Sequence, residues 1–132
     1  MTPLRRLLFG AFGLLEFGWG LWAYLAPHHF FVTFPGGGYH WTAGYPPYNA
    51  HLVADLGATF LTLGVLLLTA AWLDDRRVST VVVVAEVLFA ALHLLFHVRH
   101  RGTLGADYGL SLLTLVLGVL VPPLVLLTYR RA

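Results

Sequence analysis

Four long apolar runs, separated by shorter polar segments, dominate the pattern of hydrophobic and polar positions along this chain. They cover Leu4–Leu25, His51–Leu73, Val78–Val98 and Tyr108–Thr128. A helix needs about 20 apolar residues to cross the hydrocarbon core of a bilayer, and each run is long enough. The pattern predicts an all-α fold, a four-helix transmembrane bundle that forms one integral membrane domain over residues 1–132, with an outer loop over residues 26–50.

The composition agrees with a membrane protein and excludes several kinds of chemistry. Hydrophobic residues make up 58% of the chain and charged residues 11%, against about 25% charged in soluble domains. The chain has no cysteine, and all eight of its basic residues are arginine. Thiol exchange, thiolate ligation and lysine Schiff-base chemistry are therefore excluded for this chain by itself.

The arginines predict an orientation, because Lys and Arg are enriched in cytoplasmic segments next to membrane helices. Arg99 and Arg101 would lie on one side of the membrane, and the other six on the opposite side: Arg5, Arg6, Arg76, Arg77, Arg130 and Arg131. We therefore expect a multi-pass protein of the cell inner (plasma) membrane with both termini cytoplasmic. The net charge of +2 follows from this bias and calls for no nucleic-acid partner.

Two pairs of ionisable residues interrupt the apolar runs, His51 with Asp55 and His93 with His97. Ionisable groups inside a membrane are costly and indicate a functional site. The spacing of four residues places each pair on one helical face. Because a short polar link joins the second and third runs, these helices are antiparallel neighbours and the two pairs lie at the same depth. The sequence predicts one metal site, made by these four residues and facing the extracytoplasmic side.

Imidazole and carboxylate ligands favour zinc or iron as the divalent metal, and the absence of cysteine argues against Cu(I). A water molecule in an open ligand position would ionise near neutral pH and become a nucleophile. Glu16 and Glu86 lie deeper in their helices and are the predicted catalytic carboxyl groups, as general base or as partners of a histidine N–H. The predicted substrate is a lipid or another hydrophobic small molecule.

Other interpretations of the same residues stay open, including whether the chain is an enzyme. His51 or His93 could hold haem b as axial ligands in an electron-transfer subunit. Asp55, Glu16 or Glu86 could carry out metal-free acid–base chemistry on a lipid. The pairs could also hold the helices together by hydrogen bonds in a non-catalytic accessory subunit.

The outer loop is rich in aromatic residues, glycine and proline and holds no charged residue. It could form an aromatic belt at the membrane interface, or a lid that moves on the glycines of residues 36–38. The belt would contain Phe30, Phe31, Phe34, Tyr39, Trp41, Tyr45 and Tyr48. Asn49 and Asp107 are predicted to cap the second and fourth helices.

Small residues in the first and second runs permit close helix packing, within one chain, in a homo-oligomer or in a larger membrane complex. They include Gly10, Gly13, Gly57, Ala58 and Gly64.

In length and topology the whole chain resembles small four-helix bacterial membrane proteins of the DoxX-like kind, although it has no diagnostic motif. The HxxxD and HxxxH pairs are similar to the ligand set of the membrane hydrolases that include alkaline ceramidases and progestin-receptor-like proteins. This resemblance implies zinc-dependent hydrolysis of lipid amides or esters, with His51, His93 and His97 as ligands and Asp55 near the water. Those families have seven helices, whereas this chain has four. HxxxD together with Glu86 also resembles the acid–base residues of the sterol isomerase family.

Overall fold

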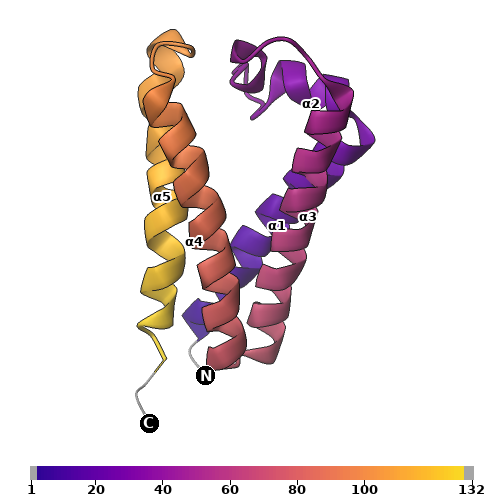
Figure 1. Cartoon of the computed structure of the whole chain (residues 1–132). Coiled ribbons are helices and arrows are strands. Elements are labelled where there is room, and N and C mark those ends of the chain that lie inside the picture. The colour runs from indigo at the N-terminus through magenta and orange to yellow at the C-terminus, as the bar shows by residue number, and fades with distance from the viewer. Residues whose placement is uncertain (1–2, 130–132) are drawn as a thin grey trace.

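The computed structural model describes residues 3–129 and confirms the all-α four-helix bundle (Figure 1). Its long helices are α1 (Pro3–Leu25), α3 (Ala50–Leu73), α4 (Arg76–Arg99) and α5 (Tyr108–Leu126). Each begins and ends within two residues of its predicted bounds. A short helix, α2 (Pro27–Thr33), and two 3₁₀ turns, Thr42–Gly44 and Gly105–Asp107, complete the elements. All four long helices are apolar enough to cross a membrane, as expected of a multi-pass membrane protein.

Side chains cap two of the four α-helices whose N-cap residues the structure describes, α3 and α4. The Asn49 side chain accepts a hydrogen bond from the Leu52 N–H at 3.1 Å, which confirms its predicted capping role. Asp75, which is not among the predicted caps, caps α4 in the same way. The capping role predicted for Asp107 is wrong. The preceding 3₁₀ turn holds Asp107 in a helical conformation, and its side chain accepts no capping hydrogen bond.

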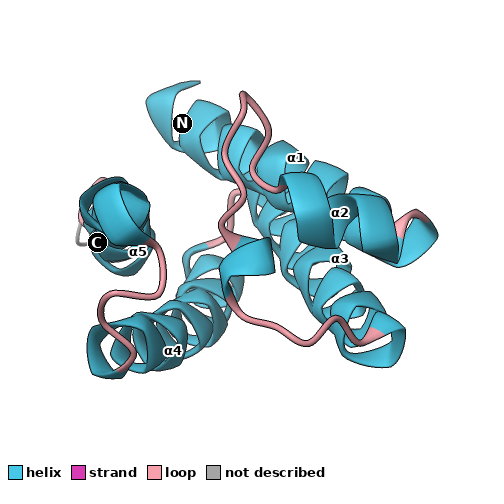
Figure 2. Ribbon diagram, turned by 90° about the horizontal axis from the view of Figure 1, so that it is seen from above, coloured by secondary structure: helices cyan, strands magenta, loops and turns pink. Residues whose placement is uncertain are grey.

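The long helices form two pairs that diverge along the molecule. Helix α1 packs along α3, and α4 packs along α5, whereas contacts between the two pairs are sparse (Figure 1). Seen from above, the α4–α5 pair stands apart from the α1–α3 pair (Figure 2). The two pairs are therefore farther apart at the end that carries α2 than at the opposite end (Figure 1).

Glycines make the close contact between α1 and α3. A Cβ atom on Gly20 would lie 2.6 Å from the Leu61 backbone nitrogen, and one on Gly64 would lie 2.7 Å from the Phe17 backbone nitrogen. Gly13 and Gly57 complete the set, so that glycines seven residues apart on each helix face one another. Because glycine has no side chain, these four positions allow the two backbones to approach closely.

The pairs join at the end of the molecule where α3 turns into α4, which we call the Arg5 end. A buried apolar cluster there draws on all four long helices, and it consists of Phe9, Leu67, Ala70, Val82, Val83 and Val125. Arg5 donates from Nε and Nη2 to the Asp74 carboxylate at 2.5 and 2.8 Å. Their side chains are only 8% and 5% exposed.

In the sequence, Arg5 indicates only the orientation in the membrane, and no sequence pattern predicts this ion pair. Tyr129 extends it, since the Arg5 guanidinium lies 3.7 Å from the centre of its ring and its hydroxyl hydrogen-bonds Ser79 at 2.7 Å. The predicted orientation also drew on Arg130 and Arg131, which lie outside the described residues.

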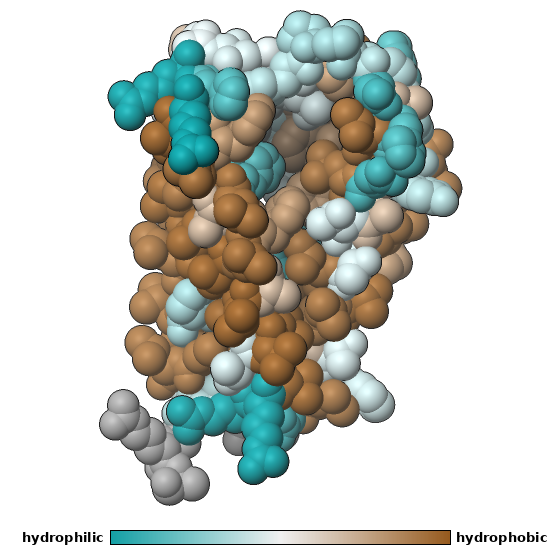
Figure 3. All heavy atoms as spheres, viewed as in Figure 1, coloured by the Kyte–Doolittle hydropathy of each residue, from teal (hydrophilic) through white to brown (hydrophobic). Residues whose placement is uncertain are grey.

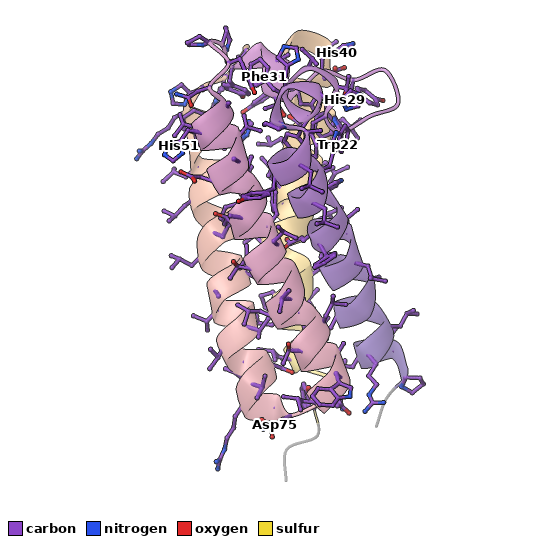
Figure 4. The ribbon with its side chains drawn as sticks, turned by 90° about the vertical axis from the view of Figure 1, so that its right-hand side faces the viewer. Trp22, His29, Phe31, His40, His51 and Asp75 are labelled. Carbon is purple, nitrogen blue, oxygen red and sulfur yellow. The ribbon has the colours of Figure 1, made fainter. Side chains whose placement is uncertain are left out.

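Residues 26–49, which we call the cover segment, fold across the opposite end of the bundle (Figure 1). Phe30 and Phe31 of α2 are 1% and 9% exposed and pack onto α1 and α3. The Trp22 indole N–H donates to His29 Nδ1 at 2.8 Å, and the two side chains lie together in Figure 4. The three glycines of residues 36–38 have φ values of 96°, 65° and 87°, in a region that other residues rarely adopt.

Candidate functional site

A cavity of about 640 Å³ lies between the two helix pairs beneath the cover segment. The space-filling view shows a recess between the pairs on the face turned to the viewer (Figure 3). Most of the lining is apolar and aromatic, with contributions from all four long helices and from the cover segment. Its ionisable side chains are Glu16, Glu86, His93, His97 and Tyr45.

The four predicted metal ligands do not come together. His51 and Asp55 lie on the outer surface of α3, where their side chains are 81% and 61% exposed and 3.4 Å apart. Figure 4 labels His51. His93 and His97 lie on α4 and line the cavity. The sequence predicts equal depth on neighbouring helices, but the side chains of His51 and Asp55 are exposed and do not line the cavity. The expected common face of the two pairs is therefore not found.

His93 and His97 form the polar contact at the cover end of the cavity. Their Nε2 atoms are 3.0 Å apart, and His97 Nδ1 lies 2.8 Å from the Tyr45 hydroxyl. Tyr45 belongs to the cover segment, so this hydrogen bond ties the segment to α4. Burial raises the pKa of Tyr45 above its ordinary value of 10.0, which keeps the hydroxyl protonated at neutral pH.

Glu16 and Glu86 reach the same cavity from facing helices, α1 and α4, and their carboxyl groups interact with each other. Glu86 is only 4% exposed. Glu16 Oε2 and Glu86 Oε1 are buried and have no hydrogen-bond partner among the described residues. A buried carboxyl oxygen without a donor costs free energy, so this pair can accept hydrogen bonds from a molecule in the cavity.

Aromatic rings line the cavity beside the carboxyl pair. The ring centres of Trp19 and Phe60 are 6.0 Å apart, those of Phe60 and Phe89 are 5.7 Å apart, and those of Phe89 and His93 are 5.6 Å apart. These edge-to-face contacts run from α1 across α3 to α4. These rings are not among the predicted site residues, although Trp19 and Phe89 each lie three residues after a carboxyl residue and so share its helical face.

The cover segment has the position expected of a lid. Phe34, Trp41, Thr42 and Tyr45 line the cavity from above. Trp41 Nε1 is buried without a hydrogen-bond partner among the described residues. The burial of Phe30 and Phe31 does not fit the belt interpretation for these two residues, since belt residues contact lipid headgroups.

Within residues 3–129, no group of three or more His, Asp or Glu side chains is close enough to hold a metal ion. The structure offers a pair of imidazoles instead, and metal binding stays a prediction. Of the two histidines named as haem ligands, His51 is exposed and His93 lines the cavity, and haem binding stays a prediction.

Comparison of the chain with protein-family models, with curated proteins and with solved structures finds no match in any of the three.

Proposed function

We propose that this chain is a membrane protein that takes a lipid-soluble small molecule into the cavity between its helix pairs. The observation that carries this proposal is the interacting pair of Glu16 and Glu86 inside an apolar cavity of about 640 Å³. Binding sites for small molecules are concave, mostly apolar, and about 300–1,000 Å³ in volume, with a few polar groups that fix orientation. The cavity has each of these properties.

The same pair supports proton transfer to and from the bound molecule. When Glu16 and Glu86 share a single proton, one carboxyl group can donate it while the other accepts one from the ligand. No metal or co-reactant is needed for such an exchange. This is the role that we propose for the two residues predicted to be catalytic.

The binding of an apolar molecule can be tested through tryptophan fluorescence, because Trp19 and Trp41 line the cavity. The protein is reconstituted in phosphatidylcholine nanodiscs with Trp72, which is 76% exposed on α3, replaced by Phe. The probe is 1,10-dibromodecane, a neutral quencher, and its concentration is expressed as a mole fraction of lipid. We expect saturable quenching at a low mole fraction.

Two variants of α4 separate the cavity from the lipid-facing surface. Ala90 lines the cavity, and Ala90→Phe should abolish the saturable quenching. Leu88 is 61% exposed, and Leu88→Phe should leave the quenching unchanged. Quenching that rises linearly with the probe and is identical in both variants would contradict the proposed binding.

A second candidate function is metal binding by His93 and His97. Two nitrogen ligands on a tetrahedral zinc ion lie about 3.3 Å apart at ordinary bond lengths, close to the 3.0 Å between the two Nε2 atoms. Tyr45 would then act on His97 Nδ1 as a partner that orients the ring. Water or the bound molecule would supply the remaining ligands.

A further inference from the structure

We infer that the molecule bound in the cavity is a cationic amphiphile, a primary or secondary amine whose N–H groups meet the carboxyl groups of Glu16 and Glu86. This inference names the ligand class of the proposed binding site and rests on that proposal. Three properties of the cavity support it: the sign of its charged groups, its unpaired hydrogen-bond acceptors and its aromatic lining.

The charged groups favour a cation. The side chains that line the cavity include two carboxyl groups and no arginine, and the chain has no lysine. Arg5, the buried arginine of the described residues, is paired with Asp74 at the other end of the bundle. An anionic ligand would therefore enter a space of low dielectric without a counter-charge, at a large cost in free energy. An ammonium group finds opposite charge there.

Hydrogen bonding favours a ligand with several donors. Glu16 Oε2 and Glu86 Oε1 both lack a donor among the described residues. An alcohol offers one O–H, whereas a primary ammonium group offers three N–H donors and can reach both carboxyl groups at once. Hydrogen bonds between two charged groups are roughly twice as strong as those between neutral groups.

The aromatic lining favours a positive charge at the depth of the two carboxyl groups. Trp19 follows Glu16 by three residues on α1, and Phe89 follows Glu86 by three residues on α4, so both rings share a helical face with a carboxyl group. All four side chains line the cavity, and Phe60 lies between the two rings. The faces of aromatic rings attract cations, most strongly in the case of Trp. The apolar part of the amphiphile then extends toward the cover segment.

The test is displacement of the brominated probe in the same nanodiscs at neutral pH by four compounds with one chain length. These are decylamine, decanol, decanoate and decyltrimethylammonium. We expect decylamine to displace the probe at a mole fraction at least about tenfold lower than the other three. In the double variant Glu16→Gln and Glu86→Gln, the advantage of decylamine should disappear while decanol displaces the probe as before.

Binding of the probe to the double variant shows that the cavity is still formed, so a loss of amine preference is not a loss of folding. Equal displacement by decanol or decanoate would overturn the inference and leave the proposed function intact. Equal displacement by decyltrimethylammonium, which carries the charge but no N–H, would overturn the assigned contact. If the probe itself never binds saturably, the proposed function fails instead.

Discussion

Arg5 and Asp74 are 69 positions apart in the chain, and their side chains form a two-point ion pair that is almost completely shielded from solvent. It ties the first turn of α1 to the turn between α3 and α4. Because the two helix pairs diverge from the Arg5 end, the Arg5–Asp74 ion pair lies where the two halves of the molecule are joined. Its loss should weaken the whole bundle rather than one helix.

Replacing Arg5 by Ala leaves the Asp74 carboxylate buried without its partner. Removing one member of a buried ion pair costs about 3–5 kcal/mol. We expect Arg5→Ala to lower the thermal unfolding midpoint in detergent clearly. Arg77→Ala, at an exposed position one residue into α4, is the control and should have little effect. Equal midpoints for the two variants would show that the ion pair does not stabilise the fold.

The same pair predicts a dependence of stability on pH. The Arg5 guanidinium holds the pKa of Asp74 below its ordinary value of 3.8. The stabilisation is therefore complete above that value and is lost as the pH falls through the lowered pKa. The difference in unfolding midpoint between wild type and Asp74→Asn should be constant above about pH 5 and should shrink below pH 4. A difference that is unchanged down to pH 3 would argue against this origin.

Gly20 and Gly18 offer a matched test of the α1–α3 contact. A Cβ atom at Gly20 would collide with backbone atoms of α3, whereas one at Gly18 meets nothing within 4 Å. Gly20→Ala should destabilise the protein by about 1–3 kcal/mol. Gly18→Ala should be neutral or slightly stabilising, because Ala favours helix. Unfolding in a denaturing detergent measures both, and a neutral Gly20→Ala would mean that the helices can separate at no cost.

The hydrogen bond between Tyr45 and His97 predicts control of access to the cavity. Tyr45→Phe removes the hydroxyl that joins the cover segment to α4 while keeping the ring in place. We expect several-fold faster association and release of the brominated probe in stopped-flow quenching, with little change in the unfolding midpoint. Tyr39→Phe, in the same segment but outside the cavity lining, is the control. Unchanged rates in Tyr45→Phe would contradict a lid role.

Metal content tests the histidine pair against the four-ligand hypothesis. Elemental analysis of protein purified without chelators should show zinc or iron in wild type and its loss in His93→Ala. His51→Ala should retain the metal, since His51 lies on the outer surface of α3. Loss of the metal in both variants would support the four-ligand hypothesis. Absence of metal from the wild type, even after reloading, would contradict metal binding by the histidine pair.

The helix bounds could be predicted from the sequence because the thickness of a bilayer fixes the length of an apolar run. The depth of each residue in the membrane could be predicted from its position along the helix. This placed Glu16 and Glu86 farther from the cover segment than His97. The face of each helix that points into the bundle could not be predicted, since nearly every face of these runs is apolar. The hydrophobic pattern therefore gives no direction toward the centre of the bundle.

The glycines indicate how α3 is rotated about its axis. At about 100° per residue, Asp55 lies about 160° around α3 from Gly57, and His51 about 120°. Gly57 must face α1, because only glycine fits there. His51 and Asp55 therefore point away from α1, and neither lines the cavity. Gly20, seven residues after Gly13 on α1, was not recognised as part of the same contact.

The packed cluster at the Arg5 end gives the cavity a floor. Phe12 and Pro122 lie at its deep end, and the buried side chains around Phe9 fill the space beyond. Among the described residues, this cluster closes the way from Glu16 and Glu86 to the Arg5 end. We therefore expect the cavity to exchange its ligand with the leaflet nearer the cover segment and to provide no path between the two aqueous compartments, so that its occupancy follows the composition of that leaflet.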